Sequence, residues 1–420
     1  MIRRTAGILV LAVLASLLAS RSDANEPHDG TLAGYLSLAE TSSPAIAAGQ
    51  ARYDAAVAGV RRSGGLPDPV VSYGHYFEEV ETRVGPQVYR FGVRQRLPWF
   101  GKLSLARDAA RERAAAEGER LRATRLGVAA SVTRAFADHA YLGRAIEVTE
   151  ERLSLLRSLD AVVRAEYSAG NASYGDVMKA QIGLARTEDS LASLLARRGA
   201  SSSRLAAAVG MREEQELPLP GEIPVAAHSV ELRETPSFRE RSPDLLALEH
   251  LQEAARYERR LAGRAYFPDL TIGVDYISTD DAPLPMVDSG KDPLIGVASI
   301  SVPLWFGKHA AAVRQSASAL DATERMTEQR TIELIAELRM TEFEYEDASR
   351  RVALYEERLV PAAEQSVAAA DAAYRGGTAD FDALVAAHEA ALEFELALAR
   401  ARADALIAEA ELARLVGASD

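Results

Sequence analysis

The sequence has no cysteine among its 420 residues. This absence excludes disulfides, thiolate catalysis, iron–sulfur clusters and thiolate zinc sites, and it removes the cysteine through which a lipoprotein is attached to lipid. The seven histidines also lack the i, i+3 or i, i+4 spacing that pairs metal ligands on a helix. We therefore expect no cofactor, no metal site within one chain and no lipid anchor.

Positive charge and long apolar runs are also scarce. The formal net charge of −13 argues against nucleic acid as a partner and favours cations or basic surfaces. Beyond the N-terminal segment no stretch reaches about 18 uninterrupted apolar residues, so we expect no transmembrane helix in the mature chain. The sequence has neither a glycine-rich phosphate loop nor a Gly-x-Ser-x-Gly elbow, and we expect no enzyme activity.

The N-terminal segment has the pattern of a secretory signal. Arg3 and Arg4 precede an apolar run from Ile8 to Ala19, and Ala24 ends a short stretch with small residues at the positions that a signal peptidase reads. The run is shorter than the roughly 20 residues of a spanning helix. We expect residues 1–24 to be a cleaved signal peptide and the mature chain to be exported across the inner membrane.

The same series of short motifs occurs twice in the mature chain. The motif Leu97–Lys102 returns as Val302–Lys308, and these two segments hold the only two tryptophans. Landmarks at 43–44, 66–68, 167–170 and 209–210 recur in the same order at 242–243, 267–269, 374–377 and 416–417. Five landmarks in one order indicate an internal duplication. The predicted repeats are residues 25–210 and 242–420, joined by a connector at 211–241.

Each repeat is predicted to contain a short helix, a β-hairpin, a very long helix and a returning long helix. A seven-residue apolar spacing in the first long helix is typical of a coiled coil, at Leu121, Val128, Ala135, Leu142, Leu156 and Val163, with Thr149 as the polar member. The predicted hairpins span about 66–98 and about 267–303. The predicted helices after them span about 103–168 and 172–210 in the first repeat, and about 309–374 and 379–417 in the second.

The strands alternate between an apolar and a charged face. Tyr89 and Phe91 alternate with Arg90 and Gly92, which is typical of a strand with one face in lipid. Four strands per chain leave two open edges, and unpaired backbone groups in lipid cost several kcal/mol each. A closed transmembrane barrel needs at least about 8 strands, so subunits must pool theirs. Three copies would supply twelve.

With these doubled motifs the chain resembles the TolC-type outer membrane efflux proteins, the outer membrane factors of tripartite efflux or type I secretion systems. The resemblance implies an α + β membrane protein with internally duplicated coiled-coil hairpins and two β-hairpins per chain. It implies a homotrimer in the bacterial outer membrane, with a 12-stranded β-barrel and a periplasmic α-helical tunnel. The implied partners are a periplasmic adaptor (membrane fusion) protein, an inner-membrane pump and outer membrane lipid.

The resemblance also places the two turns between the long helices at the periplasmic tip. The candidate residues for adaptor docking are Gly170, Asn171, Gly376, Gly377 and Thr378. Rings of carboxylates from Asp176, Asp380 and Asp382 would surround a threefold aperture and attract cations. The alternative is that these aspartates only cap the helix that follows each turn.

Two further groups of residues are candidates at the membrane. Aromatic rings and lysines at the change from strand to helix suit the headgroup level, namely Trp99, Lys102, Trp305 and Lys308. The alternative for the tryptophans is packing at a bend. The arginines of the first hairpin are candidates for the barrel lumen, namely Arg90, Arg94 and Arg96. The alternative is pairing with carboxylates of neighbouring strands, which we expect for at least one of them.

The predicted function is therefore a passive exit duct, and the alternative is a soluble periplasmic coiled-coil scaffold. The Trp-Phe-Gly-Lys form is similar to that of family members serving heavy-metal cation exporters of the resistance-nodulation-division type, and an acidic tunnel would suit cations. Export of drugs or of proteins is an open alternative.

Overall fold

The computed structural model describes residues 30–170, 172–211, 217–226, 235–284, 287–379 and 381–418. The predicted signal peptide and two candidate site residues, Asn171 and Asp380, lie outside these ranges. The chain forms two units. Unit 1 comprises the described parts of Met1–Ser43, Val128–Ala227 and Glu344–Ala410, and unit 2 comprises those of Pro44–Gly127, His228–Phe343 and Glu411–Asp420.

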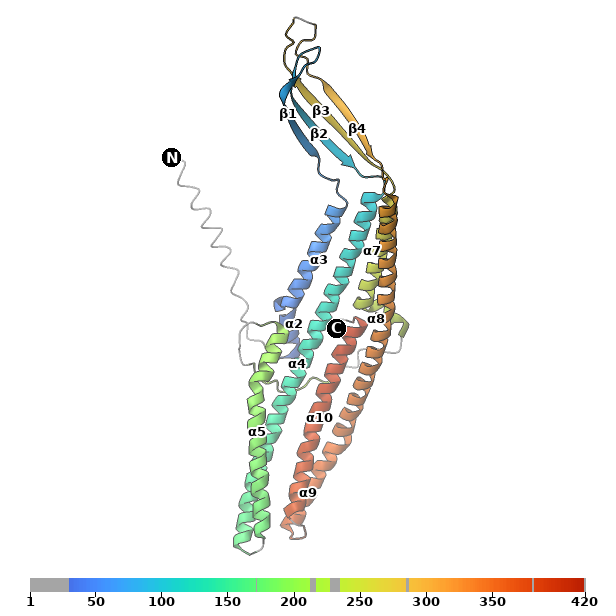
Figure 1. Ribbon diagram of the computed structural model, residues 1–420. Coiled ribbons are helices and arrows are strands. Elements are labelled where there is room, and N and C mark those ends of the chain that lie inside the picture. Colours follow the sequence, from blue (N-terminus) through green and yellow to red (C-terminus); the bar gives the residue numbers. More distant parts are fainter. Residues whose placement is uncertain are drawn as a thin grey trace, which may run out of the picture. The chain divides into compact units, whose positions relative to one another are not determined.

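Helices dominate the chain, and the element order of the first half recurs in the second (Figure 1). The first half contains α2 (Leu32–Ser42), α3 (Pro44–Ser63), β1 (Val70–Val80), β2 (Gln87–Leu97), α4 (Lys102–Ser168) and α5 (Tyr174–Val209). The second half contains α6 (Thr235–Arg241), α7 (Pro243–Arg264), β3 (Asp269–Thr279), β4 (Leu294–Ser301), α8 (Phe306–Leu354), the π turn η1 (Tyr355–Leu359), α9 (Val360–Arg375) and α10 (Phe381–Val416). The predicted fold of long helices with two β-hairpins is confirmed.

The second long helix differs from the prediction of one uninterrupted helix over about 309–374. It consists of α8, a five-residue π turn and α9. Pro361 lies in the first turn of α9, where its ring nitrogen cannot donate to the carbonyl four residues earlier. A π turn just before the proline accommodates this missing bond within a continuing helix. The first long helix, α4, contains no proline and runs unbroken for 67 residues.

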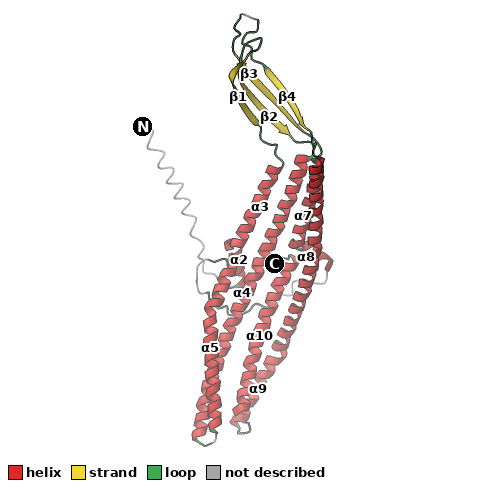
Figure 2. Cartoon of the chain, viewed as in Figure 1, coloured by secondary structure: helices red, strands yellow, loops and turns green. Residues whose placement is uncertain are grey.

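Unit 2 contains one antiparallel sheet with the strand order β1-β2-β3-β4 (Figure 2). The central pairing, β2 with β3, joins the two halves of the chain and places Gly92 opposite Asp275. The two edges therefore belong to different halves, with β1 at one and β4 at the other. One face carries exposed apolar side chains, including Tyr73, Phe91 and Val274.

The core of unit 1 forms where α2 packs on α4 and α5. Tyr35 and Phe136 are almost fully buried, with ring centroids 6.0 Å apart. The seven-residue spacing of α4 falls on this buried side, because Ala135, Leu156 and Val163 are all buried. In α10 half of the buried positions are alanines, which let neighbouring helices approach closely.

Part of the predicted connector belongs to this core. Leu217 is buried in the cluster around Phe136, and its N–H donates to Ser202 Oγ over 2.7 Å. Next to it lies His139 of α4, fully buried, whose Nδ1 is 2.9 Å from Ser201 Oγ. Burial lowers the pKa of His139 below its ordinary value, against the opposing effect of the carbonyls of Leu217 and of Pro218.

We predict that acid destabilises unit 1 through His139. Its pKa is lower in the folded than in the unfolded chain, so the unfolded chain takes up the proton first. The free energy of unfolding therefore falls as pH drops below the ordinary value of 6.5 and levels off below the folded pKa. Urea unfolding at pH 7.5 and at pH 5.5, values chosen on either side of about 6.5, measures this loss. The His139→Asn variant should lose less between the two conditions, and an equal loss would contradict the prediction.

Candidate functional sites

The charged face of the sheet is built around two buried carboxylates. The Asp275 side chain of β3 is fully buried and accepts hydrogen bonds from Arg90 and Arg94 of β2, the latter over 3.2 Å. Gly92 faces Asp275, and a Cβ at this position would overlap the carboxylate. Glycine is therefore required there by close approach.

The alternative expected for at least one arginine, pairing with a carboxylate, holds for all three. Arg96 Nε donates to Asp269 Oδ2 over 3.1 Å, just as Arg90 and Arg94 pair with Asp275. The side chains of Arg90 and Arg94 stay 41% and 40% exposed, so their guanidinium groups also reach the surface of this face. Arg90 and Arg94 can therefore pair with Asp275 and line the surface of this face at the same time.

The junction from β2 to α4 is held by Asp269, the first residue of β3. Its Oδ1 accepts from Lys102 Nζ over 2.6 Å and from the backbone N–H of Trp99 over 2.9 Å. The Trp99 ring stacks on Phe267, with centroids 5.9 Å apart and planes 15° from parallel. Trp99 and Lys102 are thus packed within the chain. Their counterparts, Trp305 and Lys308, are exposed, the tryptophan to 76%.

Asp176, a candidate aperture residue, caps α5. Ser173 Oγ accepts from the Asp176 N–H over 3.2 Å, and the Asp176 carboxylate accepts from the Ser173 N–H over 3.1 Å. This reciprocal pair is a capping box, which satisfies two orphan donors of the helix end. The hydrogen bonds from Ser173 lower the pKa of Asp176 because they stabilise the charged form. The capping alternative therefore holds for Asp176.

Asp382, at the start of α10, is joined to α5. Lys179 Nζ lies 2.6 Å from Asp382 Oδ2 and 3.9 Å from Asp176 Oδ1, so one lysine contacts carboxylates from both turns. Sequence reasoning missed Lys179, although the chain contains only four lysines. Of the tip residues, Gly170 and Gly377 end α4 and α9 with φ of 84° and 69°, a conformation that favours glycine. Gly376 and Thr378 share the second turn with Gly377.

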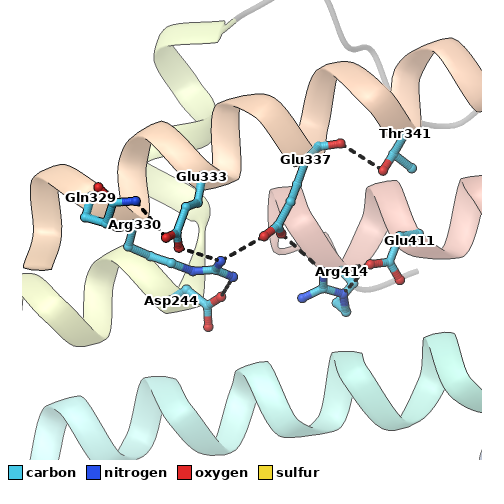
Figure 3. Close-up of polar contacts among 8 residues, drawn as sticks. All are labelled: Asp244, Gln329, Arg330, Glu333, Glu337, Thr341, Glu411 and Arg414. Atoms are coloured by element: carbon cyan, nitrogen blue, oxygen red, sulfur yellow. Dashed lines mark hydrogen bonds and ion pairs between the residues drawn. The ribbon is translucent and has the colours of Figure 1, made fainter.

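A second polar cluster ties α7, α8 and the end of α10 together in unit 2 (Figure 3). Arg330 contacts Asp244 over 2.7 Å and Glu337 over 2.9 Å, and Arg414 contacts Glu411 over 2.6 Å and Glu337 over 3.8 Å. Burial disfavours the charged form of Arg330, but its hydrogen bonds to the two carboxylates outweigh this and raise its pKa. No local sequence pattern connects residues so far apart along the chain.

Two kinds of feature are absent from the described residues. No group of three or more histidine or acidic side chains there has the arrangement of a metal site. Within the same ranges, no helix is both long enough and apolar enough to cross a membrane.

Comparisons with known proteins agree on one fold. The sequence profile of the family described as "Outer membrane efflux protein" matches residues 35–211 and 236–418. Comparison with curated protein sequences gives no match. Among solved structures, the outer-membrane channel OprN has 20% identity and a TM-score of 0.79, over 93% of this chain and 91% of that one.

Two further solved structures are similar. The outer membrane protein VceC of Vibrio cholerae has 20% identity and a TM-score of 0.73, over 92% of this chain and 96% of that one. CusC, which was studied for the conformational changes that accompany its folding and transmembrane channel formation, has 16% identity and a TM-score of 0.76, over 93% of each chain. At these identities the likeness shows the fold.

We predict that Asp176→Ala weakens the start of α5. Loss of a capping residue costs about 1 kcal/mol, which should appear as faster amide hydrogen exchange in the first turn of the helix. The control is Asp189→Ala, an exposed aspartate in the middle of the same helix. Equal exchange in the two variants would argue against the capping role.

We also predict that Arg330→Gln destabilises unit 2 by about 2 kcal/mol, somewhat less than the loss from a fully buried pair, since the arginine side chain is 27% exposed. The substitution leaves Asp244 and Glu333 without the cation that contacts them both, and Glu337 keeps only Arg414, over 3.8 Å. The matched control on the same helix is Arg325→Gln, whose side chain is 70% exposed and whose loss should cost less than about 0.5 kcal/mol. Chemical denaturation measures both, and equal costs would contradict the assignment.

Proposed function

This chain belongs to the outer membrane efflux protein family, and we propose that it is the passive exit duct of a tripartite efflux system. In this proposal the chain performs no chemistry, and an inner-membrane pump supplies the energy. The two repeats, 25–210 and 242–420, contribute equivalent parts to the duct.

The observation that carries the proposal is the incomplete sheet. Its four strands end in the open edges β1 and β4, and one face presents mostly apolar side chains to the surroundings. In lipid each unpaired backbone group costs several kcal/mol, so the edges must be paired. A homotrimer would pool twelve strands, which exceeds the roughly 8 that a closed barrel needs.

The opposite face supplies the polar interior that a duct needs. In the closed barrel the apolar face would contact lipid, and Arg90, Arg94 and Arg96 would line the lumen while remaining paired with Asp275 and Asp269. Trp305 and Lys308 are exposed at the end of β4, and they suit the headgroup level. We propose the same level for Trp99 and Lys102, which keep their contacts within the chain.

The partners proposed here are those expected of a duct in a tripartite system. We assign adaptor docking to the two turns, at Gly170, Asn171, Gly376, Gly377 and Thr378. The pump is of the resistance-nodulation-division type, and the substrates are heavy-metal cations or drugs. Together with Asp380, Asp382 supplies acidic groups to the periplasmic aperture, with Lys179 as the partner of Asp382.

If the apolar face of the sheet contacts lipid, an added arginine should prevent assembly of the trimer on that face and be tolerated on the other. Val274→Arg puts a charge on the exposed apolar face, where it costs about 2–4 kcal/mol at the bilayer midplane. We expect this variant to lose the heat-modifiable trimer that detergent extracts from outer membranes. The control Ser299→Arg adds the same charge to the polar face of β4 and should assemble.

The same fractionation tests the proposal as a whole. A detergent-extracted trimer of the unaltered chain in the outer membrane supports the duct. A freely soluble monomer would overturn it in favour of the periplasmic scaffold. Normal assembly of Val274→Arg would refute the lipid placement of this face.

A further inference from the structure

The contact between Lys102 and Asp269 joins the two repeats within one chain. Lys102 follows the last strand of the first repeat, and Asp269 begins the first strand of the second. The carboxylate also holds the Trp99 N–H, and the Trp99 ring stacks on Phe267 two residues before Asp269. The end of one repeat is thereby fastened to the beginning of the next.

The duplication supplies a second copy of each partner in this contact. Lys308 corresponds to Lys102 and Trp305 to Trp99, while Asp68 corresponds to Asp269 in the Pro-Asp pair before each hairpin. Lys102 and Lys308 are two of only four lysines in the chain. The sequence therefore contains the parts of a second junction, between the end of the second repeat and the beginning of the first.

The parts of this second junction lie at opposite edges of the sheet. Asp68 comes just before β1 and Lys308 follows just after β4, and both side chains are exposed. Three strand spacings of about 4.8 Å separate these edges by roughly 14 Å, too far for an ion pair. Trp305 is 76% exposed and Leu66, the counterpart of Phe267, is 56% exposed. Within one chain the second junction cannot close.

We infer that the second junction closes between two copies of this chain. Lys308 of one copy pairs with Asp68 of the next, and Trp305 covers Leu66, so that β4 of one copy lies beside β1 of its neighbour. This inference rests on the proposed assembly and names the side chains that set its geometry. The contact joins unlike surfaces head to tail, and such an interface generates a closed ring when the rotation between neighbouring copies closes.

The proposed junction between copies has fewer hydrogen-bond donors than the junction around Asp269 within one chain. Asp269 accepts from Arg96, Lys102 and the Trp99 N–H, but Ser301 occupies the position that corresponds to Arg96. An extra residue, Leu304, also separates the proline from the tryptophan in the second motif. The contact within the chain is therefore the stronger of the two, which suits a chain that folds before its copies associate.

The natural absence of cysteine allows a direct cross-linking test. The full chain carrying Asp68→Cys and Lys308→Cys is treated in outer membranes with a short bis-maleimide and run on a denaturing gel. We expect covalent dimers and trimers, whereas either single substitution can give no species larger than a dimer. The pair Lys102→Cys with Asp269→Cys is the calibration, because the same reagent should bridge it within one chain and leave a monomer.

Charge reversal provides a second measurement that does not depend on the reach of a reagent. Lys308→Asp and Asp68→Lys should each lower the temperature at which the extracted trimer dissociates, and the two together should restore it. Lys291→Asp is the control, since Lys291 lies in the loop after β3 and contacts Asp288 of the same loop.

The results separate the inference from the proposed function. A trimer of the unaltered chain, with neither cross-linked trimers from the cysteine pair nor recovery in the double reversal, overturns the Lys308–Asp68 contact and leaves the duct intact. Absence of any trimer of the unaltered chain from the outer membrane overturns both. Cross-linked trimers together with recovery support the contact.

Discussion

The pairing of β2 with β3 is the interaction on which the sheet depends, because it is the only pairing among the described strands that connects the two halves of the chain. Asp275 and Asp269 lie on β3, and their cationic partners lie on or just after β2. Burial of a carboxylate is costly unless it is paired and hydrogen-bonded. A slip of one residue would move both carboxylates to the apolar face, so these pairs fix the register.

That register determines how the rest of the sheet can be used. The paired arginines and aspartates are placed on one face, the other face is mostly apolar and exposed, and the outer edges of β1 and β4 are left unpaired among the described strands. Edges and an apolar face of this kind are a liability in water and an advantage in a closed ring. The two strand–helix junctions differ in their contacts, because Asp269 accepts from Lys102 and from the Trp99 N–H at the first, while Trp305 at the second is exposed.

The helices depend on local signals that mostly act within a few turns. The seven-residue spacing in α4 predicted its buried side, and a capping box begins α5 at Ser173. The break in the second long helix was not predicted, although Pro361 is visible in the sequence, because the helix continues past the proline through a π turn. The buried position of Leu217 in the connector was also missed, since a proline- and glutamate-rich segment carries no periodic signal.

The sequence by itself determined the duplication, the long helices and the two-faced strands, because repeats and side-chain periods of 2 and 3.5 can be counted along one chain. The tertiary structure decided which charges meet. Arg330 and Asp244 are 86 residues apart, and Arg96 and Asp269 are 173 apart. It also decided that Asp176 accepts from a helix N-terminus and that Asp382 has Lys179 beside it. Such partners come together only when packing and strand register place distant segments side by side. A local sequence pattern therefore cannot show which of them will pair.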